Sequence, residues 1–241
     1  MRFRTVLELM NECRTYNKLT IAELASIAGL PRAGELERYF SGEEEPTFAF
    51  VDHFSSVFGV NHHWLKFGEV TPYISEETRH LEATDYYDRI VSLAPAYIFF
   101  VQDKSTCRES GIVLKLADWK YHTLPRYWRI STEVGSTGRH QIYSFYQLIV
   151  KLKNDGFYGR CGGRRLTPQQ FVRLFGGQVF PGALIDRPMA ESNWWDDFTD
   201  IIHEYPIATR YRELYGEEFV AAQRIVLEIC KQRGEQASRT L

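Results

Sequence analysis

A segment rich in glycine and arginine, residues 156–165, has the residue types in this sequence that most directly suggest binding chemistry. It contains four glycines and three arginines. Successive glycines allow backbone N–H groups to converge on an anion, and the arginines would add positive charge. However, the segment lacks the Gly-Lys-Ser/Thr ending of a P-loop, and no strand clearly precedes it. We therefore expect a surface loop here in preference to a phosphate site.

The cysteines raise the question of thiol reactivity. Cys161 lies close in sequence to Arg160, Arg164 and Arg165, whose charges could lower the pKa of its thiol. An ordinary free cysteine is the favoured alternative. No CxxC pair occurs, so neither a zinc site nor a disulfide framework is expected. The remaining cysteines are scattered along the chain: Cys13, Cys107 and Cys230.

Adjacent histidines and a group of aspartates could suggest a metal site or an acidic site. His62 and His63 would point about 100° apart on a helix, so they cannot chelate one ion together. Asp196, Asp197 and Asp200 are interleaved with apolar residues, which favours the solvated face of an amphipathic helix. No HExxH, nucleophile elbow or dinucleotide-binding fingerprint occurs. We therefore expect no enzyme activity, no catalytic residue, no metal and no cofactor.

The composition is that of a globular protein rich in aromatic residues. Of the 241 residues, 44% are hydrophobic and 25% are charged, which excludes a disordered or fibrous chain. Aromatic residues make up 15%, enough for a large core. No apolar window of about 18 residues occurs, and the N-terminus does not resemble a signal peptide. We expect a soluble, cytoplasmic protein without a membrane span.

The charge is nearly balanced in both parts of the chain. Residues 1–70 hold seven Lys or Arg and ten Asp or Glu, which gives −3, and the remainder carries +1. Neither part is the strongly basic body that favours non-specific binding to nucleic acid. Any DNA binding must therefore depend on individually placed residues.

The first seventy residues predict a compact all-α domain of five short helices. The first runs from about Thr5 to Asn17 by its apolar spacing. Thr20 opens the second, with Glu23 completing a capping box, and Gly29 ends it. The third is expected over residues 32–40, after Pro31.

Two further helices follow a polar break at residues 43–47. Thr47 is the expected N-cap of the fourth helix, whose apolar stripe leads to Gly59. Asn61 is the expected N-cap of the fifth, which ends before Gly68. The stripe of the fourth helix consists of Phe48, Val51, Phe54 and Phe58.

The order and spacing of these residues resemble the lambda-repressor-like helix-turn-helix domains, the Xre family. Leu19-Thr20-x-x-Glu23-Leu24-Ala25-x-x-Ala28-Gly29-Leu30 is similar to the family's second helix and tight turn. Ser41-Gly42-x-x-x-Pro46-Thr47 is similar to the linker after its recognition helix. Residues 48–60 resemble its fourth helix, and Trp64-Leu65-x-x-Gly68-Glu69 resembles its ending. The resemblance covers under a third of the chain.

The resemblance implies that the third helix enters the major groove of DNA, with its first residues contacting base edges. Arg32 or Arg38 would then bind a guanine through two hydrogen bonds, and Glu35 or Glu37 would accept from cytosine N4. Thr20 is placed for a phosphate. The expected function is a sequence-specific transcriptional regulator of bacterial or phage type, which binds operator DNA as a homodimer.

The acidic loop formed by Glu43, Glu44 and Glu45 leaves other interpretations open. These carboxylates would repel phosphates if they faced DNA. The N-terminal domain could therefore keep the helix-turn-helix fold and bind a protein partner without reading DNA. A further alternative is an enzyme whose catalytic domain lies in the unrecognised remainder of the chain.

Residues 96–241 predict a separate α+β domain, preceded by a linker at 71–95 in which residues 75–77 could cap a helix. A loop is expected at 135–138, and residues 142–153 fit either a strand or a helix. Strands are expected at 96–101, 111–116 and 126–131. Helices are expected at 167–175, 193–205 and 217–232.

This second domain is expected to sense a small-molecule or protein effector, to hold the dimer, or to do both. Ligand pockets are mostly apolar with a few polar groups. Candidate pocket residues, for which plain core packing is the favoured alternative, are Tyr97, Phe99, Trp119, Tyr121 and Trp128. The expected dimerisation element is the last helix, through Phe219, Val220, Ile225, Val226 and Ile229.

Overall fold

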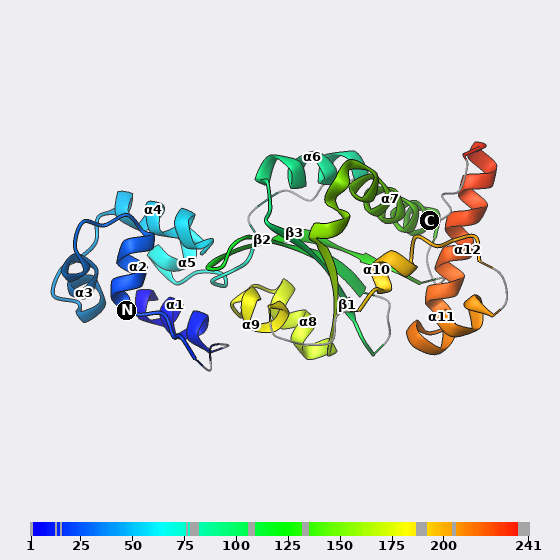
Figure 1. Ribbon diagram of the computed structural model, residues 1–241. Coiled ribbons are helices and arrows are strands. Elements are labelled where there is room, and N and C mark those ends of the chain that lie inside the picture. Colours follow the sequence, from blue (N-terminus) through cyan, green and yellow to red (C-terminus); the bar gives the residue numbers. More distant parts are fainter. Residues whose placement is uncertain are drawn as a thin grey trace. The chain divides into compact units, whose positions relative to one another are not determined.

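The computed structural model (Figure 1) describes residues 2–12, 14, 16–75, 77, 82–105, 109–131, 135–186, 192–203 and 206–235. Two of the cysteines considered above, Cys13 and Cys107, lie outside the described residues. The chain divides into two compact units. The first comprises Met1–Glu77, Lys115–Pro125 and Val172–Met189, and the second comprises Thr78–Leu114, Arg126–Phe171 and Ala190–Leu241.

The first unit is not one continuous stretch, and this differs from the domain expected at residues 1–70. The Thr71 hydroxyl donates a hydrogen bond to the carbonyl of Gly176 at 2.6 Å. The Tyr73 N–H donates to the carbonyl of Gly177 at 2.9 Å. These long-range contacts fix part of the expected linker to the first unit, and local sequence patterns could not reveal them.

Among the described residues, five helices occupy the N-terminal part of the first unit. Thr47 and Asn61 accept backbone hydrogen bonds as the N-caps of the fourth and fifth, as the sequence predicts. The first helix ends at Asn11, well before the expected Asn17, and the Asn11 amide then bonds to both the backbone N–H and the carbonyl of Leu19. The helices are α1 (Arg2–Asn11), α2 (Ile21–Ile27), α3 (Ala33–Ser41), α4 (Phe48–Phe58) and α5 (His62–Phe67).

The core of this unit is largely aromatic. The Phe3 ring meets Phe54 edge-on with centroids 4.8 Å apart, and Phe54 lies 4.4 Å from Phe58. Leu24 of α2 and Leu36 of α3 are fully buried. Aromatic pairs of this kind contribute about 0.5–1.5 kcal/mol beyond the area that they bury. The core therefore holds α2 and α3 against α1 and α4.

The C-terminal half of the chain contains a mixed sheet, which confirms the α+β prediction for this part of the chain. Its strand order is β3-β2-β1-β4. β2 and β3 are joined by only two residues, so they must be antiparallel. β1 pairs with β4 in parallel, with Ile98 opposite Cys161 and Asp103 opposite Leu166. The strands are β1 (Tyr97–Asp103), β2 (Glu109–Ala117), β3 (Lys120–Arg129) and β4 (Cys161–Leu166).

β4 corrects the second part of the surface loop predicted at residues 156–165, whereas residues 158–160 are exposed. Two of its glycines face close neighbours: a Cβ at Gly162 would lie 2.6 Å from the Tyr97 hydroxyl, and one at Gly163 would lie 1.9 Å from the Ser192 carbonyl. The Arg164 guanidinium lies over the Phe99 ring, 5.1 Å from its centroid, and the residue is buried. These residues therefore serve packing, and they form no exposed anion cradle.

Helices α6 (Ala83–Leu93) and α7 (Ser136–Leu152) lie over one face of the sheet (Figure 1). Trp128 of β3 packs against Tyr86 of α6 and Phe145 of α7, with centroids 5.1 and 4.7 Å away. The ambiguous residues 142–152 are therefore helical, because they bury one face on the sheet. The loop expected at 135–138 is wrong, since α7 begins at Ser136.

The C-terminal helices depart from expectation in two places. The helix expected at 193–205 is only one turn long. The side-chain amide of Gln223 donates hydrogen bonds to the carbonyls of Asp197 and Asp200, at 2.8 and 2.9 Å, which in a longer helix would accept backbone N–H groups. The last helix buries Phe219 and Val226 within its own unit, which removes the apolar face expected to dimerise. The helices are α8 (Pro168–Phe175), α9 (Pro181–Ile185), α10 (Trp194–Asp197), α11 (Ile207–Tyr215) and α12 (Glu217–Arg233).

Among the described residues, no helix combines the length and the apolar character that crossing a membrane requires. The longest, α7 and α12, have 17 residues each.

Candidate nucleic-acid interface

The helix α3 has one buried side and one exposed side. Leu36 is fully buried and Phe40 is 4% exposed, so these two residues fix the helix in the core. Gly42 ends it in the left-handed conformation, with φ of 82°, and donates its N–H to the Arg38 carbonyl. The opposite side of α3 presents Gly34, Glu37, Arg38 and Ser41, which are all exposed.

The turn between α2 and α3 is tight. Ala25 and Ala28 are nearly fully buried. The Leu30 N–H donates to the Ala25 carbonyl at 2.9 Å, and Gly29 adopts a φ of 70° that a residue with a side chain disfavours. His53 of α4 bonds to the Ala28 carbonyl at 2.9 Å. The turn is therefore held from both sides, which fixes the direction in which α3 leaves α2.

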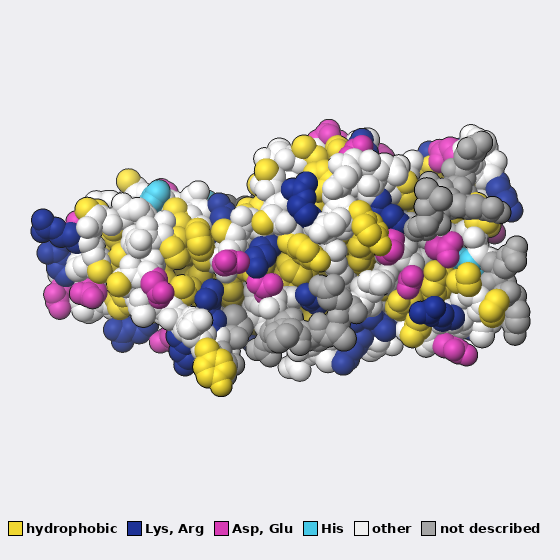
Figure 2. Space-filling view, viewed as in Figure 1, with side chains coloured by type: hydrophobic (Ala, Val, Ile, Leu, Met, Phe, Trp, Pro, Cys, Tyr) yellow, Lys and Arg dark blue, Asp and Glu magenta, His cyan; other side chains and the backbone are white. Residues whose placement is uncertain are grey.

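Four of the five predicted DNA-contacting residues are exposed. These four are Thr20, Arg32, Glu37 and Arg38. The fifth, Glu35, is partly buried. Figure 2 shows Lys and Arg side chains beside Asp and Glu side chains at the end of the first unit that carries α3. The exposed surface of α3 thus combines both charges, as the sequence of this helix implies.

Thr20 already has an intramolecular role. Its hydroxyl accepts from the Glu23 N–H at 3.2 Å, while its backbone N–H donates to the Glu23 carboxylate at 2.7 Å. The Thr20 N–H and the Thr20 hydroxyl both donate to the Glu23 carboxylate, at 2.7 and 3.0 Å, and these two bonds lower its pKa. The predicted capping box is therefore confirmed. A phosphate bound at Thr20 would lie beside the Glu23 carboxylate.

An ion pair within α3 and its following loop was not predicted from the sequence. The Arg38 Nε lies 2.9 Å from Glu44 Oε2, and the two side chains are 52% and 46% exposed. The loop folds back because the N–H groups of Gly42, Glu43 and Glu44 all point at the Arg38 carbonyl, at 3.0, 3.0 and 3.3 Å. The sequence offered only a weak signal for this pair, an arginine and a glutamate separated by a helix-ending glycine.

The five aromatic residues predicted to line a ligand pocket are divided between the two units. Trp119 and Tyr121 belong to the first unit, and the other three belong to the second. Tyr97 lies against Phe99 at 4.7 Å, whereas Trp128 is fully buried between α6 and α7. None of the five lines either of two cavities that described residues enclose. The packing of Phe99, Tyr121 and Trp128 is that of core residues.

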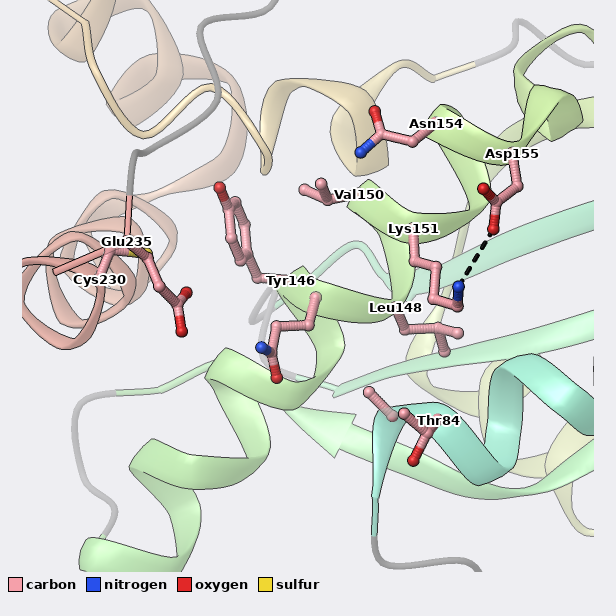
Figure 3. Close-up of a pocket in the computed structure, with 11 residues that line it drawn as sticks. Thr84, Tyr146, Leu148, Val150, Lys151, Asn154, Asp155, Cys230 and Glu235 are labelled. Atoms are coloured by element: carbon pink, nitrogen blue, oxygen red, sulfur yellow. Dashed lines mark hydrogen bonds and ion pairs between the residues drawn. The ribbon is translucent and has the colours of Figure 1, made fainter. Parts of the chain in front are cut away.

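One of these cavities lies in the second unit, where α7 passes between α6 and α12 (Figure 3). Its volume is about 380 Å³. Glu235 and Tyr146 lie on one side, and the ion pair between Lys151 and Asp155, 3.2 Å apart, lies on the other. The lining therefore combines carboxylates, an aromatic ring and apolar side chains.

The aspartates near residue 197 form a hydrogen-bonded cluster instead of a solvated face. Lys153 Nζ lies 2.5 Å from Asp196, and the Tyr215 hydroxyl donates to Asp197 at 2.6 Å. The Tyr211 hydroxyl donates to Asp200 at 2.9 Å. Burial, the largest effect, raises the pKa of Asp197. These carboxylates connect α10 to α11, so the expected solvated face is wrong.

The thiol and histidine candidates also have structural explanations. Cys161 is 8% exposed, and burial raises the pKa of its thiol to about 12 despite the nearby Arg160. The thiol is therefore not activated. The rings of His62 and His63 lie 4.4 Å apart. Within the described ranges, no group of three or more His, Cys, Asp or Glu residues could hold a metal ion.

The chain matches no protein-family model, no curated protein and no solved structure. The resemblance to lambda-repressor-like domains therefore depends on the residues between Leu19 and Glu69 themselves.

Proposed function

We propose that this protein binds double-stranded DNA sequence-specifically through α3 and thereby regulates transcription. The observation that carries the proposal is the division of α3 into a side fixed by Leu36 and an exposed side bearing Glu37 and Arg38. The short, hydrogen-bonded turn after α2 supports it as well. In helix-turn-helix proteins, a second helix held in this way enters the major groove.

The charge of the N-terminal part favours binding through a few placed contacts. Residues 1–70 carry −3, so few phosphates can be neutralised. Each neutralised phosphate contributes about −0.9 to the slope of log K against log salt. About two or three basic side chains in each of two heads would give a slope of only about −4 to −5. Specificity would then come mainly from contacts with bases.

A homodimer remains part of the proposal, because one helix reads too few bases to define an operator. Since α12 buries its apolar side within its own unit, the dimer contact must use other surfaces. An effector would be a small molecule or a protein that acts on the second unit, where the cavity beside α7 offers space for a small molecule.

The direct test is selection of duplexes from a random-sequence pool by the full-length protein. We expect the selected duplex to bind about a thousandfold or more tightly than a scrambled one. Arg38→Ala should weaken binding to the selected duplex by about 1–3 kcal/mol if Arg38 contacts a base. Arg210→Ala, which removes an exposed arginine from α11, is the matched control. Failure of the wild-type chain to select or bind any duplex would contradict the proposal.

A protein-binding role for the first unit is the second candidate, and one observation favours it. Phe48 is 68% exposed, and it borders a cavity of about 510 Å³ that Glu45, Pro46 and Lys66 also line. An exposed aromatic ring beside a cavity is typical of a protein-binding surface. Phe48→Ala would then abolish regulation in cells while leaving DNA binding intact. If DNA binding itself carries the function, Phe48→Ala should have little effect in either assay.

A further inference from the structure

We propose that Glu44 is a positioning residue that orients Arg38 to bind a guanine, an inference that rests on the proposed DNA-binding function. The carboxylate of Glu44 holds the Nε edge of the Arg38 guanidinium at 2.9 Å. The acidic loop thus contributes to base selection at α3.

The geometry fixes both partners of the pair. Arg38 lies in the last turn of α3, and its carbonyl accepts from the N–H groups of Gly42, Glu43 and Glu44. The Ser41 hydroxyl donates to the same carbonyl at 3.1 Å. The backbone that carries Glu44 is therefore anchored to the residue that its side chain contacts. This anchoring reduces the conformational freedom that the pair would otherwise lose on forming.

Only one edge of the guanidinium is used by Glu44. Arginine has five N–H donors, of which one is on Nε and four are on the two Nη atoms. No other hydrogen bond of the Arg38 side chain involves a described residue. The Nη donors are therefore left for an acceptor pair outside the protein.

The chemistry of that acceptor pair follows from the charge of Glu44. Guanine presents O6 and N7, two acceptors on a neutral edge, which arginine binds in a bidentate manner. A phosphate would instead bring negative charge close to the Glu44 carboxylate and be repelled. Glu44 therefore favours guanine over the DNA backbone as the partner of Arg38.

The neighbouring glutamates provide the matched control. Among the described residues, neither Glu43 nor Glu45 has an ion-pair partner, although both are exposed. Glu43 engages Arg38 only through its backbone N–H, which a change of side chain retains. An exposed ion pair contributes little to folding, so removal of the Glu44 carboxylate should leave α3 in place. Circular dichroism and the unfolding midpoint verify this for each variant.

The experiment measures duplex binding by the full-length wild-type chain and by Glu44→Ala, Glu43→Ala and Arg38→Ala. The probes are the duplex selected by the wild-type chain, its single-base-pair variants and a random duplex. Arg38→Ala identifies the G·C pair that loses discrimination. At that pair, Glu44→Ala should lose about tenfold of the discrimination against other base pairs while gaining affinity for the random duplex. Glu43→Ala should change both affinities in the same proportion, and Glu44→Gln should restore part of the discrimination.

Three results would overturn the inference. If Glu44→Ala keeps the wild-type discrimination at the pair read by Arg38, Glu44 does not position the guanidinium, and the DNA-binding function stands. The same conclusion follows if Glu43→Ala and Glu44→Ala reduce discrimination equally, because a general charge effect then explains both. If the wild-type chain selects no sequence at all, the proposed function and this inference fail together.

Discussion

The Tyr121 hydroxyl donates a 2.7 Å hydrogen bond to the Asp186 carboxylate. The same carboxylate lies 2.7 Å from Lys115 Nζ, which also pairs with Asp118 at 2.9 Å. Burial alone would lower the pKa of Lys115, but the hydrogen bonds to Asp186 and Asp118 outweigh it and raise the pKa. These bonds attach the joined end of β2 and β3 to the segment that follows α9, all within the first unit.

We expect Tyr121→Phe to lower the free energy of unfolding by about 0.5–1.5 kcal/mol, because it removes a hydrogen bond but keeps the ring on Phe180. Denaturant unfolding with an unchanged m value would measure this. Tyr16→Phe, at a tyrosine that is 85% exposed, is the control and should have no effect. Equal stability of both variants would show that the bond to Asp186 contributes nothing.

Gly177→Ala should destabilise the first unit strongly. Gly177 has a φ of 66°, and a Cβ there would lie 2.2 Å from the Ile74 backbone nitrogen. Gly156→Ala is a matched control, because its φ is 83° but a Cβ would meet nothing within 4 Å. In the control, the free energy of unfolding should fall only by the cost of placing alanine in a left-handed conformation, about 1–2 kcal/mol. If thermal unfolding shows a similar loss of stability in both variants, the close approach of residues 74 and 177 is contradicted.

Local chemistry explains which parts of the fold could be predicted from the sequence. The caps by Thr20, Thr47 and Asn61 depend on residues within one turn, and all three were predicted. β4 was missed because its glycines make room for residues distant in sequence, such as the Tyr97 side chain, and a local pattern does not show this. α10 was predicted too long because the Gln223 side chain donates to the carbonyls of Asp197 and Asp200, which a longer helix would use for its own hydrogen bonds.

In the candidate site too, the local features could be predicted from the sequence and the longer-range contact could not. Periodicity predicted that Arg32, Glu37 and Arg38 are exposed, since α3 must bury Leu36. It could not predict that Glu44 returns to Arg38, because the direction of the chain after α3 depends on the left-handed conformation of Gly42. The acidic loop could therefore be interpreted from the sequence only as three equivalent charges.

Asp197 should make the stability of the second unit depend on pH in the acidic range. Burial, the largest effect, raises its pKa above the ordinary 3.8, although the hydrogen bond from Tyr215 lowers it. The folded state therefore binds the proton more tightly than the unfolded state. Stability from this group is complete below pH 3.8 and is lost as the pH rises through the folded pKa.

Asp197→Asn is expected to remove this dependence. The asparagine cannot ionise, yet its side-chain oxygen can still accept from Tyr215. The variant should match the wild type near pH 3 and have a higher unfolding midpoint at pH 7. Asp88→Asn, at an exposed aspartate of α6, is the control. Thermal unfolding between pH 3 and pH 7 measures this difference. If Asp197→Asn is less stable than the wild type at pH 7, burial of the Asp197 carboxylate does not destabilise the fold at that pH.

Gly34→Ala should affect folding and DNA binding in opposite directions. Gly34 lies on the exposed side of α3, where a Cβ would meet nothing within 4 Å. Alanine should therefore stabilise the helix by about 0.5–1 kcal/mol, because glycine loses more backbone entropy on folding. If DNA packs closely against the first turn of α3, the added methyl group should weaken binding to the selected duplex. Gly159→Ala, at another open position but in the second unit, should leave binding unchanged. An unchanged affinity of Gly34→Ala would show that DNA does not approach α3 at its first turn.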